Sequence, residues 1–447
     1  MRARPVKVSA TPGAGPTDRS HAEALDAADP LASLRERLSH DPAEPDLIYL
    51  DGNSLGRLPL TAPAAVRRVV EDEWGRGLVR SWASGPAWID EPVRVGDLLA
   101  TQVLGAEPGE VVVCDSTTVN LYKLAAAALR EQPHRRTVLV ERGAFPTDRY
   151  VLAGLAEARG LDLMLIEDDP VNGPSLAAVG AALDAAAGGA ADESGGAALL
   201  CLSAVAYTSG ARLDLAAVNA LAARHGVRVL WDLSHAAGAV PVDLAATGCE
   251  LAVGCTYKYL HAGPGAPAFL YVRRDLQTQL QSPIQGWFGQ ADQFAMGAAY
   301  DPAPTILRFT AGTPVIAGIA LVEAGAGLVA DAGMARVAMK SAALTGLLIA
   351  LADAWLAPYG CTVATPRDAA RRGGHVSITH PQAWQLCQAL VADAHVIPDF
   401  RAPDLVRLGP APLGTRFVDV WDALDRMRAL LATGAHTAYP KARGRVT

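Results

Sequence analysis

The sequence lacks an excess of basic residues. It has 39 lysines and arginines against 46 aspartates and glutamates in 447 residues, which gives a formal net charge of −7 at pH 7. A protein that binds nucleic acid or an anionic membrane needs a basic face to contact phosphate groups. We therefore expect neither nucleic acid nor a membrane among the partners of this chain.

Cysteine is scarce as well, with six residues in the chain. They are spread out without a CxxC pair, at Cys114, Cys201, Cys249, Cys255, Cys361 and Cys387. This spacing argues against disulfides and against a zinc site, so we expect no bound metal. Reduced cysteines are typical of the cytoplasm, and we expect a cytoplasmic protein.

Long apolar runs are also missing from the pattern. Residues 1–20 are rich in Pro, Gly, Ala and Arg and lack the continuous apolar core of a signal peptide. We interpret them as a mobile tail. No later stretch reads as long and apolar enough to span a membrane, so we expect no membrane-spanning helix.

The chain does have enough apolar residues, 51%, to bury a large core, and its length favours one large domain plus a smaller one. Between residues 110 and 244, five apolar strands alternate with polar turns and helices. This rhythm predicts an α/β fold with a mainly parallel sheet covered by helices on both faces.

The second half changes character. Residues 315–357 read as largely helical, and short strands at 361–364 and 375–378 alternate with helices at 382–393 and 416–432, which predicts a smaller α+β domain. The expected parts are a tail at 1–20, an N-terminal segment at 21–60 that packs with the small domain, a large cofactor-binding domain at 61–314 and the small domain at 315–447.

Lys258 lies in the stretch GCTYKYLHAGPGAPAFLYV, between two tyrosines and before a Gly-Pro-Gly turn. A lysine held on such a turn can aim its amine into a cleft and form an imine with a carbonyl partner, most often pyridoxal phosphate (PLP). The alternative is a surface lysine whose stem lies along aromatic rings.

Polar and aromatic residues follow several of the predicted strands. Because ligands gather at the carboxyl ends of parallel strands, these residues are candidates for one site. They are Thr117, Thr118, Phe145, Asp148, Ser203, Asp232 and His235. The alternative for each is a capping or turn role, which Ser, Thr and Asp also favour.

PLP needs a lysine, a phosphate cradle, an aromatic face and an acid beside its pyridine nitrogen. Asp232 is the candidate acid, since a buried carboxylate keeps that nitrogen protonated. Thr117 and Thr118 begin an alanine-rich helix whose N-terminus suits a phosphate. Phe145 could stack on the ring, and Tyr257 could donate to the phosphate.

Eight stretches together resemble the kynureninases, PLP enzymes of the aspartate aminotransferase fold (fold type I). They are YLDGNSLGRLP, DSTTVNLYK, GAFPTD, WDLSHAAGAVPVDL, GCTYKYLHAGPG, PIQGWFG, FTAGTP and DFRAPDLVRLGPAPLGTRFVDVWDAL. The resemblance runs from about residue 49 to 424 in the family's order. It implies a homodimer with a shared active site that hydrolyses L-kynurenine, a small amino acid, to anthranilate and L-alanine.

The resemblance also implies roles for single residues. Lys258 would form the PLP imine and act as base at Cα, Asp232 would contact the pyridinium with His235 beside it, and Tyr257 would assist proton transfer. The other expected cofactor contacts are Thr117, Thr118, Phe145, Asp148, Ser203 and Tyr257, with Trp287 and Thr313 reaching across from a second subunit. Arg407 would clamp the substrate carboxylate, and Asn53 and Ser54 would border the substrate ring.

Three positions depart from the family pattern. Gln290 stands where a histidine is usual, Gly414 where a tyrosine is usual and His261 where an asparagine is common. One hypothesis is a preference for a ring-substituted or enlarged kynurenine, such as 3-hydroxykynurenine, in a biosynthetic pathway. The other is neutral drift within an enzyme for plain kynurenine.

Two other classes of protein stay open. A different fold type I enzyme, such as a cysteine desulfurase, would need a reactive cysteine on a mobile loop, and the apolar surroundings of Cys361 do not resemble one. A non-catalytic PLP-fold binding protein would be expected to lose the lysine, the acid or the arginine, and this chain has all three.

Overall fold

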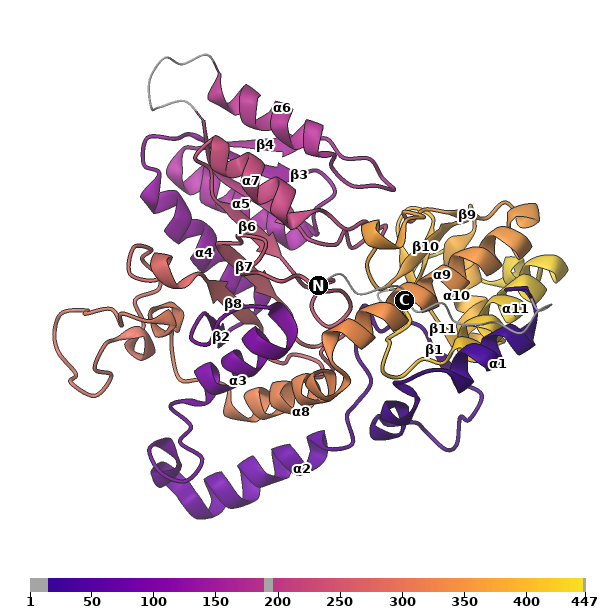
Figure 1. Cartoon of the computed structure of the whole chain (residues 1–447), viewed down its shortest axis with the longest axis horizontal. Helices are drawn as coiled ribbons and strands as arrows, with labels where there is room; N and C mark the ends of the chain where they lie inside the picture. The colour runs from indigo at the N-terminus through magenta and orange to yellow at the C-terminus, as the bar shows by residue number, and fades with distance from the viewer. Residues whose placement is uncertain (1–14, 189–195, 445–447) are drawn as a thin grey trace.

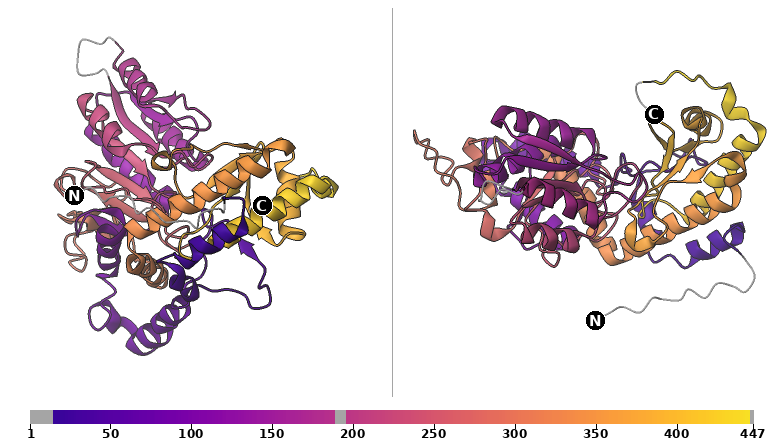
Figure 2. Two further views of the ribbon diagram at one scale, coloured as in Figure 1. Left: turned by 45° about the vertical axis from the view of Figure 1, so that its right-hand side comes forward. Right: turned by 90° about the horizontal axis from the view of Figure 1, so that it is seen from above.

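The computed structural model describes residues 15–188 and 196–444 of the chain. Figure 1 shows two bodies side by side, a larger one around a central sheet and a smaller one that contains the C-terminal part of the chain, and Figure 2 shows the same division from two further directions. Most of the predicted tail, residues 1–14, lies outside the described residues. Helix α1 (Arg19–Ala27) begins within the last residues of the predicted tail, 1–20.

The larger body is built on a seven-stranded sheet with the order β2-β8-β7-β6-β5-β3-β4. Its strands are β2 (Val111–Val113), β3 (Thr137–Glu141), β4 (Asp162–Ile166), β5 (Ala197–Ser203), β6 (Val229–Asp232), β7 (Leu251–Gly254) and β8 (Phe269–Val272). Five neighbouring strands are parallel, and β8 runs antiparallel to both β7 and β2. The sheet is therefore mainly parallel, and the predicted α/β class is confirmed.

Helices cover both faces of this sheet. They are α3 (Glu91–Leu99), α4 (Thr117–Glu131), α5 (Pro146–Arg159), α6 (Leu176–Ala187) and α7 (Leu215–Arg224). The buried side chains of α4 and α5 belong to one apolar cluster, and those of α3, α6 and α7 belong to another. Successive residues of β2 alternate between the two clusters, as the two-residue period of a strand requires.

The smaller body has an antiparallel sheet with the order β12-β13-β10-β9. Its elements are β9 (Thr362–Val363), β10 (Val376–Thr379), α10 (Ala383–Ala392), β11 (Val396–Ile397), β12 (Asp399–Arg401), β13 (Leu405–Leu408) and α11 (Phe417–Thr433). The N-terminal segment joins it, because β1 (Ile48–Tyr49) pairs in parallel with β11 and Ala22 of α1 lies in the same apolar cluster as α11.

The stretch 315–357 forms two helices, α8 (Ile316–Ala332) and α9 (Met334–Trp355), separated at Gly333, whose φ of 77° favours glycine. The buried residues of α8 belong to the core of the larger body. Within α9, Val337 still belongs to that core, whereas Leu344 belongs to the core of the smaller body. The packing thus changes inside α9 and not at residue 315.

The expectation that no stretch is long and apolar enough to span a membrane was wrong for α9. This helix passes that test by length and composition. About half of it is buried inside the protein, where Leu344, Leu348 and Leu351 pack among residues of β10, α10 and α11. Its apolar character serves two protein cores, which is the physical reason for the long run.

Candidate active site

Lys258 lies in the turn between β7 and β8, at the carboxyl edge of β7. The turn is closed by a hydrogen bond from the His261 amide to the Lys258 carbonyl, at 3.0 Å. The Nζ atom of Lys258 lies 2.7 Å from Nε2 of His235. Burial lowers the pKa of the Lys258 amine. The fold thus places a lysine that is easier to deprotonate than an ordinary lysine at the sheet edge where ligands bind.

Three carboxylates gather at the same edge. Asp232 ends β6 opposite Ser203 at the end of β5, and its Oδ1 accepts from the Ser234 amide at 2.8 Å. Asp148 lies in the first turn of α5 and is 2% exposed. Glu141 ends β3, is 2% exposed and accepts from the Ser203 amide at 2.7 Å. We call Glu141, Asp148 and Asp232 the acid group.

The surroundings of the acid group disfavour the charged forms of Glu141 and Asp148. The pKa of Asp148 is raised well above its usual value by burial and then by the charges of Asp232 and Glu141. Burial raises the pKa of Glu141 to about 7. Carboxylates crowded in a buried place favour a nearby positive charge. The charge of Lys258 opposes the rise for Asp148.

Glu141 was missed by the sequence reasoning, although a signal for it exists. It ends the apolar strand TVLVE just as Asp232 ends VRVLWD. An acid directly after a buried strand therefore marks both positions.

His375 was missed as well. It precedes β10 in the smaller body, is fully buried, and its ring centroid lies 5.5 Å from that of His235. Burial and the nearby Lys258 and Arg407 charges lower the pKa of both imidazoles. A pair of neutral histidines thus joins the two bodies beside Lys258.

The N-terminus of α4 faces the same region through its preceding loop, since the Ala268 amide after the Lys258 turn donates to the carbonyl of Asp115 at 2.9 Å. Ser116 caps the helix and accepts from the Val119 amide at 3.3 Å. Thr117 and Thr118 follow as the first two helical residues and are not buried. Their hydroxyls and amides suit an anion at the positive end of the helix.

Phe145 precedes α5 and is 41% exposed. Its ring meets the ring of Tyr207 edge to face, with centroids 5.3 Å apart and planes at 89°. The exposed face of Phe145 is available for another flat ring.

Arg407 of β13 is 1% exposed and forms an ion pair with Asp399 of β12, its neighbour in the antiparallel register. Its Nη2 also donates to Ser54 Oγ at 3.1 Å, and its Nη1 to the Tyr207 carbonyl at 2.6 Å. Nε has no partner among the described residues. We call Arg407, Asp399 and Ser54 the arginine group.

Asn53 is fully buried beside the arginine group, and its amide has no hydrogen-bond partner among the described residues. It packs on Gly409, where an added Cβ would lie 1.7 Å from Asn53 Oδ1. Only glycine allows this approach, so the turn after β1 is fitted to the end of β13. Two polar atoms remain on Asn53 for a ligand.

Trp287 and Thr313 are not brought to Lys258 within this chain. Trp287 contacts Phe288 and Phe294, is 42% exposed, and Thr313 is exposed. Figure 1 shows the salmon segment after β8 projecting from the larger body, away from the smaller one. Tyr257 does lie beside Lys258, whose Nζ is 6.0 Å from its ring centre, and burial raises the pKa of its phenol.

The three departures from the family pattern have separate surroundings. His261 is buried, with Nδ1 3.0 Å from the Arg57 carbonyl. Gly414 is buried against Leu38, whose Cδ1 would lie 3.0 Å from an added Cβ. Gln290 stays within its own projecting segment, where Oε1 accepts from the Asp301 amide at 2.8 Å. The space at Gly414 is thus filled by a neighbouring leucine.

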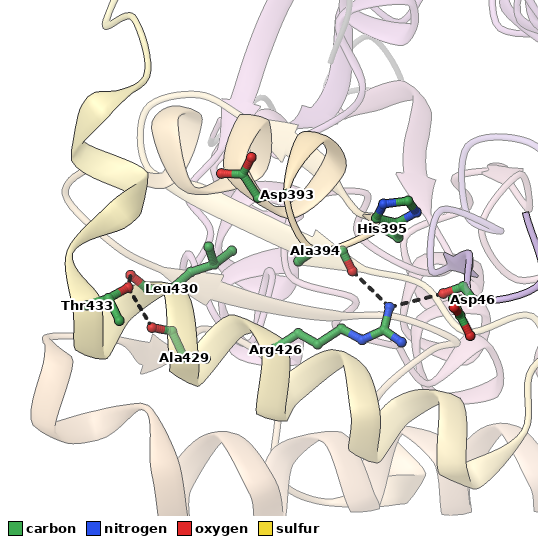
Figure 3. Close-up of a pocket in the computed structure, with 8 residues that line it drawn as sticks. All are labelled: Asp46, Asp393, Ala394, His395, Arg426, Ala429, Leu430 and Thr433. Carbon is green, nitrogen blue, oxygen red and sulfur yellow. Dashed lines mark hydrogen bonds between the residues drawn. The ribbon is translucent and has the colours of Figure 1, made fainter.

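The depression in Figure 3 lies elsewhere. It has a volume of about 450 Å³ and is lined by residues of α11 and the turn before β11, where Arg426 donates to the carbonyls of Asp46 and Ala394. Within residues 15–188 and 196–444, no group of three or more His, Cys, Asp or Glu side chains could hold a metal ion.

Comparison with known proteins identifies close relatives of the chain. The family model described as the kynureninase C-terminal domain matches residues 337–427. The kynureninase of Pseudomonas fluorescens is 43% identical over 421 residues, covering 93% of this chain and 96% of its own. The kynureninase of Burkholderia pseudomallei is 43% identical over 426 residues, covering 94% and 97%.

Solved structures share the fold at lower identity. The apo cysteine desulfurase of Thermococcus onnurineus superimposes with a TM-score of 0.73 at 18% identity, covering 90% of this chain and 96% of its own. A mutant of C-DES with glycine covalently linked to its PLP cofactor gives a TM-score of 0.72 at 17% identity, covering 89% and 98%. At this identity the likeness concerns the fold.

Proposed function

The chain belongs to the kynureninase family, and from this premise we propose how its own residues perform the family's reaction. The protein is a PLP-dependent enzyme that cleaves the Cβ–Cγ bond of a kynurenine to give an anthranilate and L-alanine. The single observation that carries the assignment of residues is the placement of a half-buried, easily deprotonated Lys258 where its charge acts on Asp148 of the acid group.

The site fits PLP on features of the structure itself. The acid group favours a nearby positive charge, which a protonated pyridine ring would supply. The exposed face of Phe145 suits the ring, and the start of α4 suits the phosphate. When bound, PLP draws electrons from the substrate's Cα and so stabilises a carbanion there.

Lys258 would bind PLP covalently and then accept the Cα proton once the substrate amine has displaced it. Burial lowers the pKa of its amine, which favours the deprotonated form that a base requires. Asp232 would hold a proton at the pyridine nitrogen, with His235, Ser203 and Asp148 beside it. Thr117, Thr118 and Tyr257 would hold the phosphate, and Tyr257 would also pass a proton during addition of water to the γ-carbonyl.

Arg407 would bind the substrate carboxylate, and Asp399 and Ser54 orient its guanidinium by direct contacts. Asn53, with its two unpartnered polar atoms, would border the substrate's ring together with Ser54. Both residues come from the turn after β1, which the contact with Gly409 holds in place.

We further propose a homodimer whose active sites are shared. Support comes from two neighbouring segments with exposed large apolar side chains, which include Val70, Trp74, Leu78, Val79, Trp287, Phe294 and Met296. Figure 1 shows both projecting from the larger body, and Trp82 and Phe288 join them with ring centroids 6.0 Å apart. Trp287 and Thr313 would reach the cofactor of the second subunit.

The dimer can be tested by mixing two inactive variants. Lys258→Ala and Trp287→Ala would be denatured together and refolded, because a shared site then leaves one intact site in each mixed dimer. About a quarter of wild-type activity should return, as half of the dimers are mixed. No recovery, in a mixture that sedimentation shows to be dimeric, would argue for sites within single subunits.

The domain division and the location of the protein stay proposals. The N-terminal segment 21–60 would belong with the small domain, as the shared apolar cluster of Ile48, Leu50 and α11 supports. A cytoplasmic location is supported by six free cysteines.

Substrate choice is the next experiment. The PLP-loaded enzyme would be given L-kynurenine, 3-hydroxykynurenine and ring-methylated or halogenated analogues, and alanine release would be followed by mass spectrometry. Because Leu38 fills the space at Gly414, we expect plain L-kynurenine to react at least as fast as the substituted compounds. A clear preference for an enlarged ring would instead support a biosynthetic role.

Lys258 itself is tested by Lys258→Ala. This variant should lose the yellow colour that borohydride bleaches in the wild type, and kynurenine turnover with it. Turnover at the wild-type rate would overturn the assignment.

A further inference from the structure

The hairpin that follows β5, residues 205–212, contacts both bodies of the protein. It leaves the larger body and folds back on itself, with the Ala206 amide donating to Ala211 at 2.8 Å and the Gly210 amide donating to Ala206 at 2.9 Å. Four consecutive carbonyls, those of residues 207–210, point outward and all accept hydrogen bonds from the smaller body.

The four donors come from different places in the smaller body. Their bonds are Arg407 Nη1 to Tyr207 at 2.6 Å, Ser377 Oγ to Thr208, Thr365 Oγ1 to Ser209 at 2.7 Å and the Gly373 amide to Gly210 at 2.7 Å. The Arg212 amide also donates to the Arg371 carbonyl at 2.8 Å. The hairpin is therefore covalently part of the larger body but hydrogen-bonded as part of the smaller one.

The side chain of Tyr207 contacts the larger body. Its ring contacts Phe145 edge to face, with centroids 5.3 Å apart, and that contact fixes the tilt of the Phe145 ring. One residue thus touches Arg407 through its carbonyl and Phe145 through its ring.

We infer that Tyr207 is a positioning residue that couples the arginine group to the aromatic face over the cofactor. The inference rests on the proposed roles of Arg407 and Phe145. A guanidinium has five N–H groups, and Arg407 uses three of them on Tyr207, Ser54 and Asp399. Its Nε is buried and has no hydrogen-bond partner among the described residues, so it is the donor left for a substrate carboxylate.

A carboxylate bound at Nε would draw the guanidinium toward it, and the bond to the Tyr207 carbonyl would transmit that shift to the hairpin. The Tyr207 ring would then shift against Phe145 and change the contact of Phe145 with the cofactor ring. A ligand with an amine but no carboxylate reaches Lys258 without producing this movement.

The test compares Tyr207→Leu with Tyr207→Phe, which keeps the ring. In Tyr207→Leu, kcat/KM for L-kynurenine should fall about 10-fold, mostly through kcat, which is near the upper end for one aromatic pair. Tyr207→Phe should restore most of the loss. The double variant Phe145→Leu/Tyr207→Leu should be no slower than Phe145→Leu, because both changes break one contact.

A spectroscopic readout separates coupling from general damage. L-Alanine should change the visible circular dichroism of bound PLP in the wild type, and ethylamine, which lacks a carboxylate, should produce a smaller change. In Tyr207→Leu the two responses should become equal. Ser377→Ala, which removes the hydrogen bond from β10 to the hairpin but keeps both rings, should reduce the response to L-alanine in the same direction.

The outcomes distinguish this inference from the proposed function. A wild type that binds no PLP or releases no alanine from kynurenine contradicts the proposed function. If the wild type is active and Tyr207→Leu has the same kcat/KM as Tyr207→Phe, the coupling alone is overturned. The same holds if the loss of kcat/KM in the double variant equals the product of the losses in the two single variants.

Discussion

The acid group and the arginine group act on the charge of Lys258 in opposite directions and are built in opposite ways. In the acid group the charges of three buried carboxylates act on one another, and burial raises the pKa of Glu141 and of Asp148. In the arginine group Arg407 is already paired with Asp399, which also lies 3.0 Å from Arg401.

This difference separates two ways of preparing a site. In the proposed site the acid group would be completed by a positive charge on the cofactor, and binding would relieve the repulsion among its carboxylates. In the arginine group the charge of Arg407 is already paired with that of Asp399. The group therefore contributes geometry, because it holds a guanidinium with few donors free. Changes on the first side should alter chemistry, and changes on the second should alter binding and stability.

The largest effect should come from the acid group. Asp232→Asn keeps the shape of the side chain but removes the charge that, in the proposed site, would hold a proton on the pyridine nitrogen. We expect kcat to fall on the order of 1,000-fold, equal to about 4 kcal/mol of activation free energy, with PLP content unchanged by absorbance. A kcat within tenfold of the wild type would remove the main contrast between the two groups.

Arg407→Met should break the arginine group in a different manner. It leaves Asp399 buried without its closest cation, which costs about 3–5 kcal/mol of stability, and raises KM for kynurenine by about 100-fold. Adding Asp399→Asn should recover much of the stability, measured by urea unfolding, but not the KM. A kcat loss at unchanged KM would show that Arg407 takes part in chemistry instead.

Glu141 gives the cofactor-free protein a pH dependence. Its pKa rises from 4.5 to about 7 in the folded protein, so the folded state binds this proton more tightly than the unfolded state. The free energy of unfolding therefore falls as pH rises through that window, by about 3 kcal/mol at most. Glu141→Gln stays neutral, and its melting temperature should decline less between about pH 5 and pH 8. Parallel curves for the two proteins would contradict this.

His261 should give the smallest effect. Burial lowers its pKa to about 4, so it is neutral near pH 7, and His261→Asn can still donate to Arg57 and tolerates the φ of 57°. We expect kcat/KM within about threefold of the wild type and an unchanged order of substrates. His261→Ala, which leaves the Arg57 carbonyl unpaired, should cost about 1 kcal/mol. A new substrate preference in His261→Asn would revive the specificity hypothesis for this position.

The sequence was sufficient for the fold class, the family and the cofactor, because strands with polar ends and the motifs around Asp232 and Lys258 are local signals. Strands β7 and β8 were missed, since four apolar residues do not distinguish a strand from other buried segments. His375 was missed because it meets His235 only through the packing of two bodies. The roles of the site residues, including Trp287 and Thr313, stay predictions.

The pairing of β1 with β11 has a consequence for synthesis of the chain. Ile48 lies opposite Val396, so the first strand emerges from the ribosome about three quarters of the chain length before its partner exists. During that time Ile48, Leu50 and Ala22 stay without the apolar neighbours that later bury them. The large sheet can fold in the interval. The small domain folds last, because its N-terminal segment packs against residues that are synthesised later.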